Sequence, residues 1–424
     1  MIIRPRKEFQ NRVPDRGLLE SCLKEHMEGA GRLDRLRAYY DGRHDIARRV
    51  RNGGLPNLKL AHGFPRYIST MAAGYLIGNP VQYEAPDQED ALAAVKLEYA
   101  AAAVDSVDAE LARDASIYGK GVELLFSDEC ACPRTAALDP RDAFVVYDDS
   151  VENRPLLGMH SAPWRAADGK LLGYIVEVYT ESDVITYRVK SLIDPRMAEP
   201  ESMRAHWFGQ VPLIEYWNDE DEKGDFEGVI GLIDAYNLLQ SDRLNDKQQF
   251  VDALLVLYGC TLETDSRGRT PGQQLREDKA ISLPDCDARA EWLCKQLNEA
   301  DTEVLRAAIK ADIHKMSMVP DLTDEHFAGN SSGVAMRYKL LGLEQLTKIK
   351  ERWFREALRS RLRGYAHFLA CRGEEALDPE RVRMIFTRAL PVNELELAQT
   401  LDALKGILPA DELERRAMQG NGRS

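Results

Sequence analysis

The chain has 424 residues, of which 44% are hydrophobic and 30% charged, a composition typical of a soluble folded protein with two or three domains. The first ten residues, MIIRPRKEFQ, lack the apolar core of a signal peptide, and no apolar run is long enough to span a bilayer. The seven cysteines are odd in number and dispersed, which argues against a disulfide framework and indicates reduced thiols in a cytosolic setting.

The net charge of −14 argues against tight binding to nucleic acid, because affinity for DNA comes mainly from neutralised phosphates. The charge is distributed unevenly along the chain. Residues 1–55 carry a net charge of +5 and residues 334–366 a net charge of +6, so the remainder is close to −25. Such asymmetry suits a protein that meets both acidic and basic surfaces.

Helical patterns dominate the first hundred residues. Leu33, Leu36 and Tyr40 share one face of a predicted helix. The stretch FPRYISTMAAGYLIGNP is apolar nearly all round and therefore indicates a buried helix. An acidic helix is then predicted over residues 102–118, and the glycine that follows it is expected to close it.

From Gly121 the pattern changes to β-branched and aromatic runs bounded by Gly, Pro and Asp, which is typical of strands. The runs are VELLF, AFVVYDD, YIVEVYTESDVITYRV and VPLIEYW. Residues 180–183 are predicted to form the turn of a hairpin. Because these strands follow one another without intervening helices, we expect an antiparallel sheet and not a doubly wound fold.

Two long helices are predicted to flank a strand-rich excursion in the next part. Asp225 is the predicted N-cap of the first helix, in which Ile233 and Tyr236 lie on one face. The second helix is predicted over residues 301–319. Between them, ALLVLYG and KAISLP predict strands on either side of a stretch rich in glycine, proline and charge.

A polar segment, PDLTDEHFAGNSSG, separates the second helix from a long one that we expect to run from Ser331 or Ser332 to about Ala370. Gly342 lies inside this long helix, where glycine costs about 1 kcal/mol relative to alanine, so we predict a kink there. FTRALP then predicts a short strand, and NELELAQTLDALKGIL predicts an amphipathic terminal helix.

The sequence contains no recognised catalytic or cofactor-binding motif. The phosphate loop GxxxxGK[ST], the dinucleotide pattern GxGxxG and the metallohydrolase pattern HExxH are all absent. The eight histidines show no ligand spacing, and Cys130 and Cys132 are too close together for ordinary zinc ligands. We therefore expect no catalytic residue, no metal and no cofactor. Another hypothesis is an enzyme, such as a nuclease, whose carboxylate site has no recognised motif. Metal-dependent cleavage of DNA would support this hypothesis.

One charge pattern on the long helix has two interpretations. Five basic residues recur at a spacing of three or four and therefore share one face: Lys348, Arg352, Arg355, Arg359 and Arg363. They form either a solvated helix face or a subunit interface that meets carboxylates of a neighbouring copy, or phosphates. Arginine suits the second interpretation because its fork binds oxyanions bidentately.

The order of these segments resembles the portal protein, or head-to-tail connector, of tailed double-stranded DNA phages, of the type found in siphophages of Gram-positive bacteria. The resemblance covers nearly the whole chain and rests on the succession of segments, since no single motif is a catalytic signature. The matching stretches are residues 39–46, 57–83, 114–126, 224–259, 319–354 and 386–408.

The resemblance implies a helix-rich α+β portal fold that assembles as a cyclic ring. The wing would comprise residues 1–224, and residues 334–390 would supply its long kinked helix and return strand. The other regions would be stem helices at 225–252 and 301–319, a clip at 253–300, a tunnel loop at 320–333, and a crown and tail at 391–424. Relatives generally carry a longer helical C-terminus, so the crown is short here.

The resemblance also implies a function and a set of partners. The ring, usually of twelve subunits, would occupy one capsid vertex and conduct double-stranded DNA during packaging and ejection. Besides itself and DNA, the chain would contact the terminase large subunit, the head–tail adaptor, and the scaffolding and major capsid proteins, with no membrane. It would assemble in the host cytoplasm and end in the virion, while the separate terminase motor hydrolyses ATP. The alternative is another homo-oligomeric phage head or neck component without a DNA channel.

In the family, the polar segment at 320–333 is the tunnel loop, which forms the narrowest ring of the channel. Its acidic residues would repel phosphates, and its glycines and serines permit movement. The residues expected to face the channel are Asp321, Thr323, Asp324, Glu325, His326, Asn330, Ser331 and Ser332. The alternative for this segment is a plain surface connection between two helices.

Overall fold

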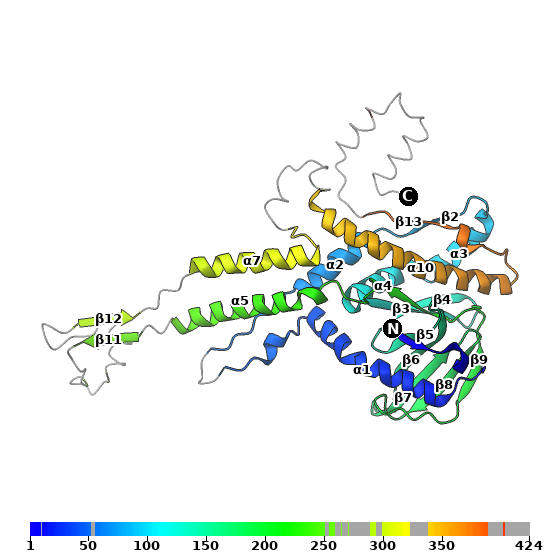
Figure 1. Cartoon of the computed structure of the whole chain (residues 1–424), viewed down its shortest axis with the longest axis horizontal. Coiled ribbons are helices and arrows are strands. Elements are labelled where there is room, and N and C mark those ends of the chain that lie inside the picture. Colours follow the sequence, from blue (N-terminus) through cyan, green and yellow to red (C-terminus); the bar gives the residue numbers. More distant parts are fainter. Residues whose placement is uncertain are drawn as a thin grey trace. The chain divides into compact units, whose positions relative to one another are not determined.

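The computed structural model mixes helices and sheets, which confirms the expectation of an α+β protein (Figure 1). It describes residues 1–9, 11–51, 56–250, 254–258, 264, 270, 289–293, 299–322, 338–388 and 402. The chain divides into two compact units. The first unit comprises Met1–Arg43, Gly63–Gly231 and Ile313–Ser424, and the second comprises His44–His62 and Leu232–Asp312.

The larger sheet of the first unit has six strands in the order β1-β5-β6-β7-β8-β9. Their bounds are Ile2–Arg4, Ala143–Asp148, Pro155–Arg165, Leu171–Tyr179, Asp183–Val189 and Ser202–Ala205. Every neighbouring pair is antiparallel except β1 and β5, in which Ile2 lies opposite Val146 in parallel register. The predicted antiparallel sheet is therefore confirmed for this part, with one parallel edge strand that the sequence analysis did not predict.

Helix α1, Arg16–Tyr40, packs on this sheet through Leu19 and Leu23, which share a buried cluster with residues of β5 to β8. Asp15 caps the helix by accepting a hydrogen bond from the N–H of Leu18 at 3.2 Å. Further along α1, Tyr39 is buried whereas Tyr40 is only half-buried. The buried face of α1 therefore includes Tyr39 in place of the predicted Tyr40.

A second, three-stranded sheet lies beneath the long helix α10, Leu341–Cys371 (Figure 1). Its strands are β10 (Leu213–Trp217), β3 (Lys120–Ser127) and β4 (Pro133–Leu138). The helices α2, α3 and α4 span Phe64–Ile77, Glu89–Ala101 and Val104–Tyr118, and β13 (Arg383–Ile385) pairs with β2 (Gln82–Glu84). Leu358, Leu362 and Tyr365 of α10 join Leu125 and Tyr216 in the main buried cluster.

Several predicted boundaries move in the structure. The helix expected over residues 102–118 is α4, which begins two residues later at Val104, because Ala103 adopts a left-handed conformation with φ of 50° between α3 and α4. Gly119 closes α4 with φ of 91°, as predicted. The hairpin turn is confirmed, since the N–H of Thr180 donates to the carbonyl of Asp183 at 2.9 Å. The return strand β13 ends just before Phe386, so it lies earlier than the FTRALP stretch.

The second unit contains most of the antiparallel helices α5 (Ile230–Phe250) and α7 (Glu299–Ser317). Two ion pairs join them, between Arg243 and Glu303 at 3.0 Å and between Lys247 and Glu299 at 2.8 Å. The strands β11 (Leu254–Tyr258) and β12 (Arg289–Leu293) form an antiparallel pair. Short 3-10 helices occur at Arg6–Phe9, Asp45–Arg48, Glu227–Val229 and Pro379–Arg381. Across the described residues, no helix combines the length and apolar character needed to cross a bilayer.

Candidate functional site

A polar ladder on α5 holds an extended stretch of chain within the second unit. Asn237, Ser241 and Asn245 recur every four residues and are fully buried. Their side-chain oxygens accept hydrogen bonds from alternate backbone N–H groups of residues 58–62 at 2.6 to 3.0 Å. The predicted apolar face of this helix is therefore confirmed at Ile233, and it becomes a polar face from Asn237 onward.

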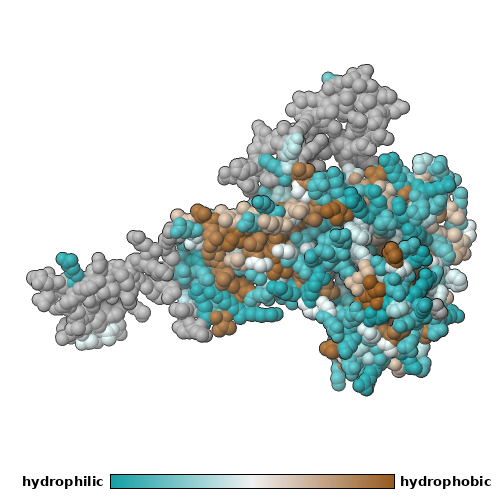
Figure 2. All heavy atoms as spheres, in the orientation of Figure 1, coloured by the Kyte–Doolittle hydropathy of each residue, from teal (hydrophilic) through white to brown (hydrophobic). Residues whose placement is uncertain are grey.

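The apolar face of α7 is largely exposed in the single chain. Val304, Leu305 and Met316 are 70%, 50% and 60% exposed, whereas Ile313 is fully buried. Figure 2 shows hydrophobic side chains gathered along α7. Exposed apolar patches of this kind on a folded chain mark sites of association with another molecule.

The basic residues of α10 share a face as predicted, and carboxylates of the same chain neutralise several of them. Arg355 lies 2.5 Å from Glu351, one turn earlier in the helix. Arg359 and Arg363 both contact Glu380, at 3.5 and 3.1 Å. These pairs are partly exposed, so each contributes about 1 kcal/mol or less to the stability of the fold.

Two residues at the N-terminal half of this face are more accessible. Lys348 is 3.8 Å from Glu344, and its side chain remains 55% exposed. Arg352 is exposed and makes no ion pair with any residue that the structure describes. Arg388, from beyond β13, donates hydrogen bonds to Glu344 at 3.2 Å and Glu351 at 2.7 Å. Of the five basic side chains, Arg352 is therefore the one best placed to meet another molecule.

The opposite face of α10 carries a buried positive charge that the sequence analysis did not single out. Lys350 is only 3% exposed, and its ammonium group contacts the carboxylate of Asp225. The same carboxylate accepts hydrogen bonds from Ser116 at 2.5 Å and Asn218 at 2.9 Å. The prediction that Asp225 caps α5 is therefore wrong, because its side chain joins α10 to α4 instead.

A second buried ion pair joins the two sheets of the first unit. Lys120 of β3 lies 2.8 Å from Glu215 of β10, which also accepts a hydrogen bond from the N–H of Val145 at 3.1 Å. Burial alone would raise the pKa of Glu215, but the Lys120 ammonium and these hydrogen bonds lower it below its ordinary value. The carboxylate is therefore ionised near neutral pH and fixes the position of β5 against β10.

The expected tunnel loop enters the described part of the chain only at its start. Asp321 is described, and its carboxylate lies 4.0 Å from Nε2 of His314 in the last turn of α7. The remaining expected channel residues fall outside the described residues: Thr323, Asp324, Glu325, His326, Asn330, Ser331 and Ser332. The greater part of the expected clip and nearly all of the expected crown also fall outside them.

Gly342 is the second residue of α10, although the sequence predicted a helix that begins about ten residues earlier. Residues 338 and 339 are also helical, and a turn at Leu340 separates them from α10. A Cβ atom at Gly342 would lie 3.5 Å from the carbonyl oxygen of Met318, an ordinary van der Waals contact. The kink predicted at Gly342 stays a prediction.

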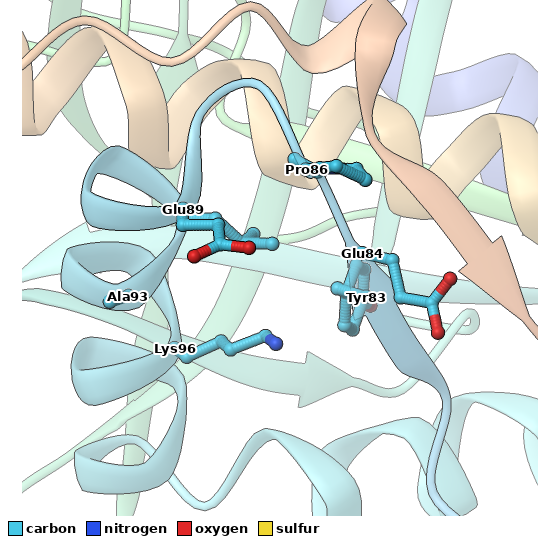
Figure 3. A pocket seen from close by; sticks show the side chains of 8 residues that line it. Tyr83, Glu84, Pro86, Glu89, Ala93 and Lys96 are labelled. Atoms are coloured by element: carbon cyan, nitrogen blue, oxygen red, sulfur yellow. The ribbon is translucent and has the colours of Figure 1, made fainter. Parts of the chain in front are cut away.

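A small open pocket with a volume of about 430 Å³ lies between β2 and α3 (Figure 3). Glu84 of β2 and Glu89 and Lys96 of α3 supply its charged groups, and Tyr83, Pro86 and Ala93 also line it. Two carboxylates and an ammonium group on an open surface are typical of a solvated turn, since active-site pockets are mostly enclosed and apolar.

The described part of the chain contains no group of three or more histidine, cysteine or carboxylate side chains that could hold a metal ion. The four cysteines in this part are free: Cys22 is buried, Cys130 and Cys371 are exposed, and Cys132 is half-buried.

The sequence matches a protein-family model over almost its whole length. A family model described as "Phage portal protein, SPP1 Gp6-like" matches residues 19–417. The chain belongs to this family of phage portal proteins. It is therefore a structural component of the capsid vertex that serves DNA packaging.

Two relatives of this portal protein carry the same description. The portal protein of Bacillus phage SPP1 is 24% identical over 382 residues, which cover 86% of this chain and 73% of that protein. The portal protein of Clostridium phage phiCD119 is 24% identical over 208 residues, which cover 48% of this chain and 44% of that protein.

Sequence reasoning missed the buried charges of the portal protein although a signal for them exists. Lys350 and Arg361 occupy positions in the apolar stripe of α10, next to Phe354, Leu358 and Tyr365 at spacings of three and four. A charge in a core-facing position requires a buried partner. That partner is distant in sequence, so the pattern reveals the need for a partner but not its identity.

Proposed function

We propose that the portal protein assembles as a closed ring of about twelve copies around a channel for double-stranded DNA. The observation that carries the proposal is the exposed apolar face of α7, at Val304, Leu305 and Met316, in a chain of a portal family. Burial of such a face against a neighbouring copy removes apolar surface from water, at roughly 25 cal/mol per Å².

The regions of the proposed ring follow the described elements. Residues 1–224 and 334–390 form the wing, which agrees with the pairing of β13 with β2 inside one unit. Stem helices at 225–252 and 301–319 correspond to α5 and α7. The clip lies at 253–300, and the short crown and tail lie at 391–424.

The segment at 320–333 is the proposed tunnel loop, whose acidic residues face the DNA. Asp321, Asp324 and Glu325 repel phosphates, so the duplex slides without being held. The acidic net charge of −14 supports this property, because a conduit with many basic contacts would retain its cargo.

A cyclic ring requires two different, complementary surfaces on each copy. The basic face of α10 is one proposed surface, and the acidic remainder of the chain supplies candidates for the other. Within that face we assign the intermolecular contact to Lys348 and Arg352, since the intrachain carboxylates Glu351 and Glu380 already contact the other three.

The proposed partners follow from a portal at the capsid vertex. The ring binds itself, surrounds DNA, and docks the terminase large subunit and later the head–tail adaptor, with scaffolding and major capsid proteins around it. It requires no catalysis, cofactor or metal of its own, since the separate terminase supplies the energy. The protein assembles in the host cytoplasm and remains in the virion.

Replacement of residues 323–333 by a Gly/Ser linker of equal length tests the channel. Rings should still form, while the nuclease-resistant DNA per particle should fall. Normal packaging would make the segment a plain connection between helices. Rings without a central hole in electron micrographs would favour the alternative, a head or neck component that conducts no DNA. Metal-dependent cleavage of DNA that one carboxylate substitution abolishes would instead support a nuclease.

A further inference from the structure

The chain leaves α7 through a tightly bonded turn. Met318 has φ of 58°, a left-handed conformation that costs a residue other than glycine about 1 kcal/mol or more. Val319, which follows it, is fully buried, and its N–H donates to the hydroxyl of Ser317 at 3.4 Å. Such a conformation persists only when surrounding contacts determine it.

Tyr67, in the first turn of α2, supplies one of these contacts. Its hydroxyl donates a hydrogen bond to the carbonyl of Pro320 at 2.8 Å and accepts one from the N–H of Leu322 at 3.1 Å. A single hydroxyl therefore holds two backbone groups on either side of Asp321. Tyr67 is 253 positions from Pro320 and 255 positions from Leu322, so both hydrogen bonds are tertiary contacts.

His314 supplies the other contact, from the last turn of α7. Its Nδ1 lies 2.9 Å from the carbonyl oxygen of Val319 and must carry the hydrogen, since a carbonyl can only accept. Its ring lies edge-on against the rings of Phe64 and Tyr67, with centroids 5.9 and 5.7 Å away. The imidazole thus joins the end of α7 to the start of α2.

The chain returns to the same place after residue 337. Gly342 lies so close to Met318 that a Cβ atom there would be 3.5 Å from the Met318 carbonyl oxygen and 3.7 Å from its Cβ atom. Met318 and Gly342, which lie on either side of the stretch 323–337, are therefore neighbours, beside the bonds that Tyr67 and His314 make.

We propose that Tyr67 and His314 are positioning residues that clamp the base of the tunnel loop and hold residues 319–322 in one conformation. This rests on the proposed role of residues 320–333 in the channel. A fixed base gives every copy in the ring the same starting point for its loop. Loss of the clamp releases residues 319–322, and the narrowest part of the channel loses its defined position.

Amide hydrogen exchange on the full-length protein tests the clamp directly. Tyr67→Phe removes only the hydroxyl, and the Leu322 amide should exchange about five- to tenfold faster, the effect of losing one hydrogen bond. Tyr187→Phe is the matched control, because the Tyr187 hydroxyl is buried without a hydrogen-bond partner among the described residues. The control should leave exchange at residues 319–322 unchanged.

His314 provides a rescue experiment. His314→Leu removes the donor to Val319 and should speed exchange at residues 319–322. His314→Asn places an amide N–H near the position of Nδ1, and it should restore slow exchange. A purely packing role for His314 would make both variants alike, or would favour leucine, and would overturn the clamp.

Ring formation and DNA packaging complete the test. Tyr67→Phe should form rings with an unchanged melting temperature within a few degrees, yet the nuclease-resistant DNA per particle should fall at least twofold. Unchanged exchange at Leu322, or faster exchange with normal packaging, would overturn the proposal. If residues 320–333 do not line the channel, the Gly/Ser linker variant should package DNA normally. That result distinguishes failure of the proposed channel role from failure of the clamp.

Discussion

The guanidinium of Arg361 in α10 donates a hydrogen bond to the carboxylate of Glu123 in β3 at 2.6 Å, and neither side chain is exposed. Asp108 of α4 lies 2.6 Å from the same guanidinium, and Tyr216 donates a hydrogen bond to Glu123 at 2.6 Å. One arginine therefore ties a long helix to a strand and to a second helix inside the core of the first unit.

Removal of this arginine should destabilise the fold strongly. Arg361→Met leaves Glu123 and Asp108 buried without their counter-ion, and the free energy of unfolding should fall by about 3–5 kcal/mol. Arg363→Met, at an exposed position of the same helix, should change the free energy of unfolding by about 1 kcal/mol or less. Urea unfolding followed by circular dichroism measures both. Equal effects of the two substitutions would contradict the buried network.

Asp114 of α4 gives a prediction that depends on pH. Burial raises the pKa of Asp114 to about 6, whereas its value in an unfolded chain is near 3.9. The folded state therefore binds the proton more tightly, and the stability from this site is present below pH 4 and lost as the pH rises through 6.

Asp114→Asn should accordingly stabilise the protein at pH 7.5 by about 3 kcal/mol, since a change of one in pKa corresponds to about 1.4 kcal/mol. The gain should vanish at pH 4, where the native carboxyl group is already protonated. Asp105→Asn, at an exposed position of the same helix, should change stability little at either pH. A gain of equal size at both pH values would show that the charge of Asp114 is not its cause.

Substitution of Gly342 tests whether the long helix must bend at this residue. A Cβ atom there meets only ordinary contacts, so Gly342→Ala should fold and should raise the melting temperature slightly, by an effect of about 1 kcal/mol or less. If the helix must bend at Gly342 during DNA passage, the same variant should package less DNA. Gly74→Ala in α2, where a Cβ atom would meet nothing within 4 Å, is the control for a helix that needs no bend.

Charge reversal on α10 separates intrachain from intermolecular contacts. Arg352→Glu should weaken ring assembly at low salt without lowering the melting temperature of the single chain, because Arg352 has no partner among the described residues. Arg355→Glu should affect both assembly and stability, since it also loses Glu351. Analytical ultracentrifugation at two salt concentrations reads out assembly. Unchanged sedimentation of both variants would make this face merely solvated.

The exposed face of α7 should be the more sensitive site of assembly. Val304→Glu places a charge on a side chain that is 70% exposed in the single chain, so the chain should still fold. In a ring that buries this face, the charge loses its hydration, and the oligomer should dissociate at concentrations where the unmodified protein remains assembled. Persistence of the full oligomer would place the subunit contacts elsewhere.

Local patterns predicted those elements that local residues determine. Gly119 ends α4 because a left-handed residue is needed there, and the hairpin at 180–183 closes through neighbouring groups. The mixed α+β class and the antiparallel sheet follow from the same patterns. Resemblance in the order of segments then led to the portal family, which matches residues 19–417.

Local patterns do not predict contacts between residues that are distant in the sequence. Asp225 stands in front of a helix as a cap would, but Lys350, 125 positions later, takes its carboxylate. Strand β6 contains Gly158, His160 and Pro163, so its sequence lacks the clean alternation of a strand, and pairing with β5 and β7 forms it. For the same reason the Tyr67 clamp could not be predicted, because its two bonds join residues more than 250 positions apart.

The proposed function requires copies of this portal protein to close into a ring around a channel. Electron micrographs of the purified assembly, with its mass measured by light scattering, test it most directly. We expect end-on views with a central hole and a mass that is a multiple, near twelve, of the 47.8 kDa chain. A mass near 47.8 kDa at all protein and salt concentrations, or particles without a hole, would contradict it.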